Sequence, residues 1–244
     1  MKRSRYPLAL LLLVGCTYPV FAQTHLVPEP GQLLKHDEYH YKLRMIFSKG
    51  YDPNVILRAV ILPSFQSEQL VGIREGHQGS TVFVLTPASS VWNTELVRLQ
   101  ESGSIKTLDN NGVAISNDKN TSFQELKKRT PPDFRHIAIN ENARKLSDSH
   151  AKRITALWRA LLINVHYSTG ESTGLDGTTV HFSMWTQDYG VMSGQAWGPD
   201  PGPAGALSLF AEKLALYAAG RERDGELDSD LEDAERIIQV PNRR

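Results

Sequence analysis

Alternating apolar and polar residues predict β-strands in the first half of the chain. The alternation is clearest from Tyr39 to Phe47, where His40, Lys42 and Arg44 occupy the polar positions. The stretches on either side of Glu75–Gly79 predict a hairpin with a longer loop, because Gly residues favour a turn there. The predicted strands are Tyr39–Phe47, Val55–Leu62, Gln69–Arg74, Thr81–Thr86, Trp92–Leu99 and Val113–Ile115.

The periodicity changes in the second half of the chain. Ser116–Thr130 is polar and is followed by Pro131 and Pro132, which disfavour a helix, so it predicts a long surface loop or a domain boundary. Ser149–Val165 then places apolar residues on one helical face. The remaining predicted elements are a hairpin of Thr179–Trp185 and Val191–Trp197, a rigid Pro/Gly loop at Gly198–Pro203 and a helix at Ala204–Ala219.

This order of elements predicts an α+β fold, with antiparallel sheet or hairpins and two amphipathic helices packed on them. We expect this domain to span residues 39–220, with a subdivision near residue 131 left open. Residues 221–244 form an acidic tail, in which Leu227, Leu231, Ala234 and Ile238 keep a helical stripe. No Gly-rich phosphate loop follows a predicted strand, so the sequence gives no support to nucleotide binding.

The N-terminus has the three regions of a secretory signal. Lys2, Arg3 and Arg5 precede an apolar run from Leu8 to Val14, and small residues follow. The run is about half of the ~20 residues that a transmembrane helix needs. The pattern predicts export.

The four residues Leu13-Val14-Gly15-Cys16 resemble the lipobox of bacterial lipoproteins. This resemblance implies that residues 1–15 are a signal peptide and that Cys16 is lipidated and becomes the first mature residue. Residues 16–38 would then carry the lipid anchor and a flexible tether, and Thr17 favours the periplasmic face of the outer membrane. The alternative is cleavage after Ala22, which would leave a soluble periplasmic protein.

The charge and cysteine content of the chain exclude several kinds of partner and active site. Removal of the signal leaves 24 basic and 27 acidic residues, so no basic surplus favours nucleic acid. Cys16 is the only cysteine, which excludes disulfides, a cysteine nucleophile and Cys-type metal sites in the mature domain. We expect no cofactor.

Histidines provide two candidate clusters. On a helix, His36 and His40 would share a face and could hold a metal ion with Asp37 or Glu38. On the predicted strand they would lie about 13 Å apart, too far for one ion, so we expect no metal site there. His166 and His181 flank the Asp176-Gly177 turn, and Asp176 with His181 could form an acid/base group with Ser168, Ser172 or Ser183. The sequence has no nucleophile-elbow motif, and Asp-Gly is also an ordinary turn former.

Aromatic residues gather in the second hairpin. Trp185, Tyr189 and Trp197 are the candidate binding residues, for a partner protein or a glycan, and Phe182 lies beside them. The alternative is that these residues pack the hairpin against the helices. A glycosidase would need two facing carboxylates, for which the candidates are Glu171, Asp176, Asp188 and Asp200.

The combined pattern predicts an exported lipoprotein that binds another envelope or secreted protein without catalysis. Such a protein could be an assembly factor, an inhibitor or an immunity protein against a toxin. The alternatives are a cell-wall or carbohydrate-active hydrolase that uses residues 171–200, and a binder of a small periplasmic ligand. No residues in the sequence specifically indicate the last of these.

Overall fold

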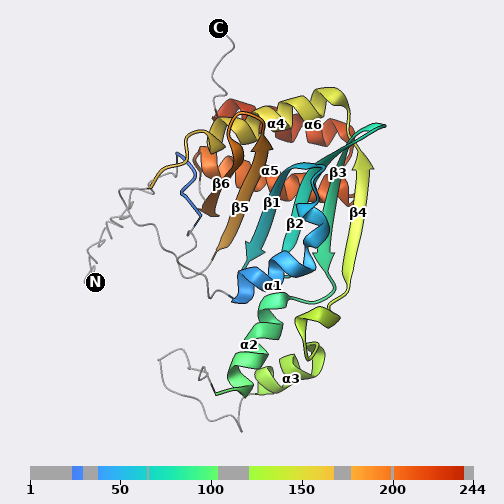
Figure 1. The fold of residues 1–244 in the computed structure, drawn as a ribbon, viewed down its shortest axis with the longest axis vertical. Helices are drawn as coiled ribbons and strands as arrows, with labels where there is room; N and C mark the ends of the chain where they lie inside the picture. Colours follow the sequence, from blue (N-terminus) through green and yellow to red (C-terminus); the bar gives the residue numbers. More distant parts are fainter. Residues whose placement is uncertain are drawn as a thin grey trace, which may run out of the picture.

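Six strands form one antiparallel sheet in the order β4-β3-β2-β1-β5-β6 (Figure 1). The computed structural model describes residues 24–29, 38–64, 66–103, 121–167, 177–198 and 201–238. Strands on both sides of Pro131 and Pro132 belong to this sheet. Their bounds are β1 Val55–Pro63, β2 Gln69–Gly76, β3 Gly79–Pro87, β4 Ile139–Lys145, β5 Thr178–Thr186 and β6 Gly190–Gly198.

Alternation along the strands sends side chains to the two faces of the sheet. In β1, Leu57 and Ala59 are fully buried on one face, whereas Arg58 lies on the other. The predicted strands 55–62, 69–74 and 81–86 and the second hairpin are confirmed. Together with the helices, they confirm the predicted α+β class.

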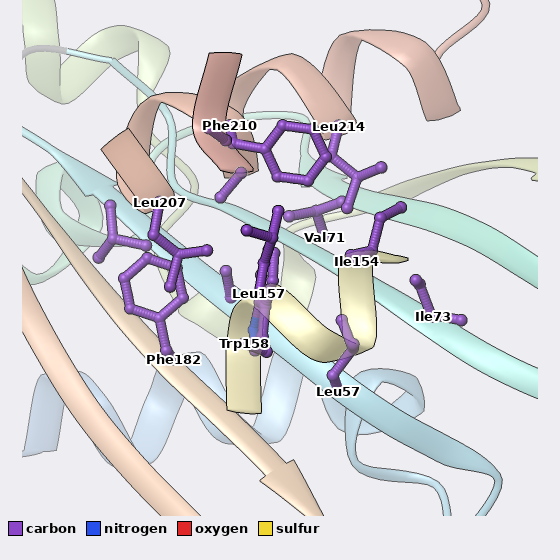
Figure 2. Close-up of a cluster of buried hydrophobic side chains, with 14 of the residues drawn as sticks. Leu57, Val71, Ile73, Ile154, Leu157, Trp158, Phe182, Leu207, Phe210 and Leu214 are labelled. Atoms are coloured by element: carbon purple, nitrogen blue, oxygen red, sulfur yellow. The ribbon is translucent and has the colours of Figure 1, made fainter. Parts of the chain in front are cut away.

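Helices α4 (Asp148–Leu162) and α5 (Pro203–Ala218) cover one face of the sheet, and α6 (Asp224–Ile238) packs on both of them. Trp158 of α4 lies at the centre of the core and is fully buried (Figure 2). Its ring meets those of Phe182 and Phe210 edge-on, with centroid distances of 5.6 and 6.3 Å. The amphipathic helices predicted at 149–165 and 204–219 are therefore present, and they pack on the sheet as expected.

The acidic tail forms α6, which docks onto α4 and α5. Its predicted stripe of Leu227, Leu231, Ala234 and Ile238 is buried in the same core. Its acidic residues face basic side chains: Asp228 lies 2.7 Å from His150, and Glu235 lies 2.8 Å from Arg153. Charge complementarity thus directs the acidic helix to a surface within the same chain.

The strand predicted at Tyr39–Phe47 is wrong, because this segment forms helix α1 (Glu38–Ile46). Leu43 and Phe47 are buried one turn apart, and Tyr41 and Met45 are exposed one turn apart. Residues four positions apart lie on the same face of a helix and also on the same face of a strand. The alternation in this segment was therefore compatible with both structures.

Two further segments were also predicted incorrectly. Trp92–Leu99 belongs to helix α2 (Val91–Glu101), and part of the polar stretch 116–130 forms helix α3 (Thr121–Arg129). Ser90 caps α2 by accepting a hydrogen bond from the Asn93 amide at 3.2 Å. Strand β4 was not predicted, because it is a polar edge strand with little burial. The strand predicted at 113–115 lies outside the described residues.

The opposite face of the sheet has a smaller core under α1. Leu43 and Phe47 pack there with Leu70, Phe83 and Leu85 of β2 and β3. The two short 3-10 helices on this side are η2 (Ser48–Tyr51) and η4 (Phe134–His136). On this face of β5 and β6, the described helices make no extensive contact, and α1 reaches β5 through the rings of His40 and His181. We call that face, with the adjoining part of β1, the open half of the sheet.

Residues 24–29, within the tether expected at 16–38, pack against the domain. Leu26 is fully buried, and Val27 exchanges backbone hydrogen bonds of 2.9 and 2.7 Å with Gln195 of β6. Pairing satisfies the backbone groups at the β6 edge. In the described part of the chain, no helix has the length and apolar character required to cross a membrane.

Candidate functional site

A pocket of about 330 Å³ lies between α1 and the open half of the sheet. This volume is at the lower end of the range for small-molecule sites. Its polar lining comes from helix and strands that are far apart in the sequence. These residues include His40, Arg44, Arg58, His181, Ser183 and Ser193.

Strand register places three polar residues in one row across the floor of the pocket. Arg58 of β1 pairs with Ser183 of β5, and Ser183 pairs with Ser193 of β6. Directly paired side chains in antiparallel strands point to the same face. A guanidinium group and two hydroxyls therefore occupy neighbouring positions on the floor.

The wall of the pocket carries a second arginine and a tyrosine. His40 and Arg44 come from consecutive turns of α1, and Tyr51 comes from η2. The Arg58 guanidinium lies 4.1 Å from the centre of the Tyr51 ring, and that of Arg44 lies 5.1 Å from it. These cation–π contacts hold both guanidinium groups at the pocket without neutralising them.

Burial changes the ionisation of the two half-buried groups. It lowers the pKa of Arg58, although the nearby Tyr51 opposes this shift. Burial also raises the pKa of Tyr51, against the effect of the Arg58 and Arg44 charges. Within the described ranges, neither arginine forms an ion pair with a carboxylate. Glu29 also attracts the Arg58 charge, but one carboxylate does not balance the two guanidinium groups of the pocket.

His181 connects the pocket to the docked N-terminal segment. Its Nδ1 lies 3.6 Å from Oε1 of Glu29, and its ring is 5.1 Å from that of His40. In an acid/base group, a carboxylate beside a histidine orients the imidazole ring. However, no hydrogen bond joins His181 to a serine hydroxyl in the residues that the structure describes. The arrangement can bind an acidic group or move a proton, but it does not include an activated nucleophile among these residues.

The exposed aromatic residues lie beside the pocket on the same hairpin. Trp185 pairs with Val191 across β5 and β6, and these two side chains are 58% and 66% exposed. Tyr189, in the connecting turn, is 60% exposed. Trp185 and Tyr189 are thus outside the core, whereas Phe182 is fully buried. Their proposed role in binding stays a prediction.

The other predicted site residues either do not line the pocket or lie outside the described residues. Trp197 is half-buried, and it stands so close to Gly177 that a Cβ there would lie 2.9 Å from its ring. Asp188 is exposed and lies 3.7 Å from Arg159. The predicted residues outside the described ranges are Cys16, His36, Ser168, Glu171, Ser172, Asp176 and Asp200.

His40, His181 and Ser183 could be singled out from the sequence, but the rest of the polar lining could not. Arg58 had one available signal, since it is the single charged residue within the apolar run Val55–Leu62. No sequence signal pointed to Arg44, Tyr51 or Glu29, because only the fold brings these residues together. In the described segments, no three His, Cys, Asp or Glu side chains are placed to hold a metal ion.

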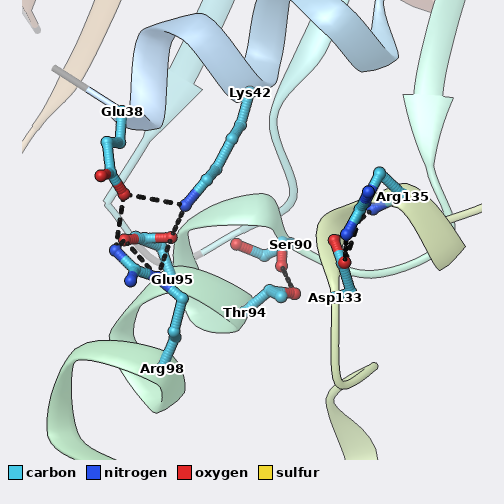
Figure 3. Close-up of polar contacts among 8 residues, drawn as sticks. All are labelled: Glu38, Lys42, Ser90, Thr94, Glu95, Arg98, Asp133 and Arg135. Atoms are coloured by element: carbon cyan, nitrogen blue, oxygen red, sulfur yellow. Dashed lines mark hydrogen bonds and ion pairs between the residues drawn. The ribbon is translucent and has the colours of Figure 1, made fainter. Parts of the chain in front are cut away.

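An ion-pair cluster attaches α1, and with it one wall of the pocket, to α2. Glu95 of α2 is almost fully buried and accepts hydrogen bonds from Lys42 of α1 and from Arg98 (Figure 3). Arg98 also contacts Glu38 at 2.6 Å. Burial alone would raise the pKa of Glu95, but the hydrogen bonds from Arg98 and Lys42 lower it below the ordinary value.

Replacing Glu95 by Gln is expected to reduce the free energy of unfolding at pH 7 by about 2–3 kcal/mol, because two charged donors lose their partner. A carboxyl with a lowered folded pKa stabilises the fold above its unfolded pKa and loses this contribution as pH falls through the folded pKa. The wild type should therefore lose stability below about pH 4.5 more steeply than the variant.

Urea unfolding at a series of pH values measures this difference. Glu101→Gln is the matched control, since Glu101 lies on the same helix but forms an exposed ion pair with Lys127. Equal acid sensitivity of wild type and Glu95→Gln would show that the cluster does not stabilise α1.

A second cavity, of about 450 Å³, lies on the other side of the sheet by the start of α5. Its lining includes Gly205, Ala206 and Leu209, together with Glu212, whose pKa is raised by burial. Small and apolar residues give it few groups that could recognise a ligand. The pocket beneath α1 is therefore the stronger candidate site.

In comparisons with known proteins, no family model, curated protein or solved structure matches the chain.

Proposed function

We propose that the protein is an exported lipoprotein that binds another envelope or secreted protein through the open half of its sheet, without catalysis. The observation that carries this proposal is the exposed group of Trp185, Tyr189 and Val191 beside the pocket. Large aromatic side chains at a surface are enriched at protein interfaces, where they supply contact area at low entropic cost.

The docked N-terminal segment supports a partner close to the membrane. Thr24, where the packed segment begins, lies eight positions after Cys16. An extended chain of this length spans at most about 29 Å. With a lipid on Cys16, the β6 edge and the neighbouring open half stay within about 30 Å of the membrane surface. A membrane protein or another anchored protein is thus the expected partner.

The His181–Glu29 pair favours a second candidate function, a hydrolase that uses acid/base chemistry. Of the carboxylates first considered for a carbohydrate-active enzyme, Asp188 lies within the described residues, and it is exposed and pairs with Arg159. Loss of binding with retained fold on replacing Trp185 and Tyr189 distinguishes partner binding from this alternative.

The test of binding compares the envelope proteins captured by immobilised wild-type protein and by the Trp185→Ala/Tyr189→Ala variant. The proposal expects a protein recovered on the wild type and depleted on the variant. Equal recovery on both would contradict it.

Replacing Cys16 by Ser tests the anchor. Without the thiol that accepts the lipid, the protein should leave the membrane pellet almost completely and appear in the soluble periplasmic fraction. Fractionation and immunoblotting measure this change, and Thr17→Ser serves as the neighbouring control. An unchanged distribution would contradict lipidation and favour cleavage after Ala22.

A further inference from the structure

The pocket contains more positive than negative charge. Arg44 and Arg58 supply two guanidinium groups, and Glu29 is the one carboxylate among the described residues that line it. Glu29 lies nearest to His181, at 3.6 Å, rather than within ion-pair distance of either arginine. A half-buried guanidinium without a carboxylate partner loses hydration that its neighbours do not fully replace.

The chemistry of the floor is suited to an anion. A guanidinium group donates hydrogen bonds in a planar fork that matches an oxyanion, and the hydroxyls of Ser183 and Ser193 lie in the same row. His40 and His181 add two ring nitrogens at the wall. Each of these groups can donate a hydrogen bond.

We infer that this pocket is a binding site for a carboxylate, held between Arg44 and Arg58 over the serine row. The two guanidinium charges exceed the charge of Glu29 by one, which matches a carboxylate monoanion better than a phosphate dianion. The volume of about 330 Å³ fits a small organic acid or a single terminal residue of a chain.

This inference does not depend on the proposed partner, because the pocket should bind a carboxylate in the isolated protein. The carboxylate has two available sources, a small free acid or the end of a partner chain. Both sources present the same carboxylate group. A short and a long carboxylate probe distinguish a small acid from a chain end.

The experiment is an NMR titration of the isotopically labelled full-length protein, purified from the envelope, with N-acetyl-alanine. The backbone amides of Ser183 and Ser193 and the arginine side-chain signals report binding. We expect a dissociation constant in the millimolar range, about 1–10 mM, for so small an acid. N-acetyl-alanine amide, which has the same shape without the charge, should produce no saturable shift.

Three variants relate the binding to the pocket. Arg58→Gln and Arg44→Gln should each weaken N-acetyl-alanine binding at least about tenfold, because each removes a charged donor. Arg44 is an exposed residue of α1, so its replacement keeps the test valid if Arg58→Gln fails to fold. Glu29→Gln should tighten binding about two- to fivefold, because it removes a competing negative charge. A loss of structure could not produce this opposite effect.

Arg135→Gln is the matched control, since Arg135 is exposed and pairs with Asp133 outside the pocket. Equal affinity in Arg58→Gln, Arg44→Gln and Arg135→Gln would overturn the inference, as would equal affinity for the acid and its amide. Tighter binding of inorganic phosphate than of N-acetyl-alanine would overturn the choice of a carboxylate. A five-residue peptide with a free C-terminus should bind more tightly than N-acetyl-alanine if the source is a chain end, and equally if it is a small acid.

Discussion

Replacing Glu68 by Ala is expected to lower the free energy of unfolding by about 3–5 kcal/mol and the melting temperature by about 10 °C. Glu68 is 1% exposed and accepts hydrogen bonds from four donors. These donors are the Tyr39 hydroxyl of α1, the Ser90 hydroxyl, and the Val91 and Trp92 amides at the start of α2, at 2.7 to 3.2 Å.

The size of this effect follows from what the substitution leaves behind. The two amide donors belong to the first turn of α2. The N–H groups of a first turn have no acceptor within the helix, and they carry a positive partial charge. An alanine would remove the acceptor of these amides and of the half-buried Tyr39 hydroxyl. Release of Tyr39 would also loosen α1, which supplies Arg44 and His40 to the pocket.

Thermal and urea unfolding measure the change. Glu68→Gln keeps the shape and one acceptor oxygen and should lose about half as much stability. Glu75→Ala is the control at an exposed position of β2, with an expected change within about 0.5 kcal/mol. A loss of less than about 1 kcal/mol for Glu68→Ala would refute the role of this carboxylate in joining α1 to α2.

The second large effect concerns binding. Replacing Trp185 and Tyr189 together by Ala should weaken capture of the partner about 100-fold, equivalent to about 3 kcal/mol. Aromatic anchors at the centre of an interface contribute the most on truncation, and these two are the large exposed aromatics of the β5–β6 hairpin. Because both side chains are already exposed, the stability of the protein alone should change by less than about 1 kcal/mol.

Leu209 provides the matched control for this prediction. Its side chain is 58% exposed, as is that of Trp185, but it lies on α5, on the opposite side of the sheet. Leu209→Ala should leave capture within about twofold of wild type. Similar weakening by both substitutions would place the contact elsewhere.

The sequence predicted the fold best where a single pattern was available. Strands β2 and β3 are buried on both faces and appear as short apolar runs between turn residues, whereas β5 alternates between apolar and polar residues. Helices α4 and α5 have long apolar stripes, so each pattern allowed one assignment. Tyr39–Phe47 satisfied both a strand and a helix, and the contacts of Leu43 and Phe47 with the sheet select the helix. Strand β4 pairs along its whole length with β3, yet its polar edge position gave no periodic signal.

The candidate site could be predicted only in part. The aromatic residues and His181 were identified because they lie in one hairpin, close together in the sequence. Arg58 reaches Ser183 through strand pairing across 125 positions, and Arg44 depends on the packing of α1. The pocket therefore depends on strand pairing and helix packing between distant segments, and local periodicity in the sequence does not predict such contacts.

The most direct test of the account places a photoreactive phenylalanine analogue at position 185 or position 209 in living cells. Ultraviolet irradiation then links it to any protein in contact. The account predicts a discrete cross-linked product from position 185 and none from position 209. A product from position 209 alone, or none from position 185, would contradict partner binding at the open half of the sheet.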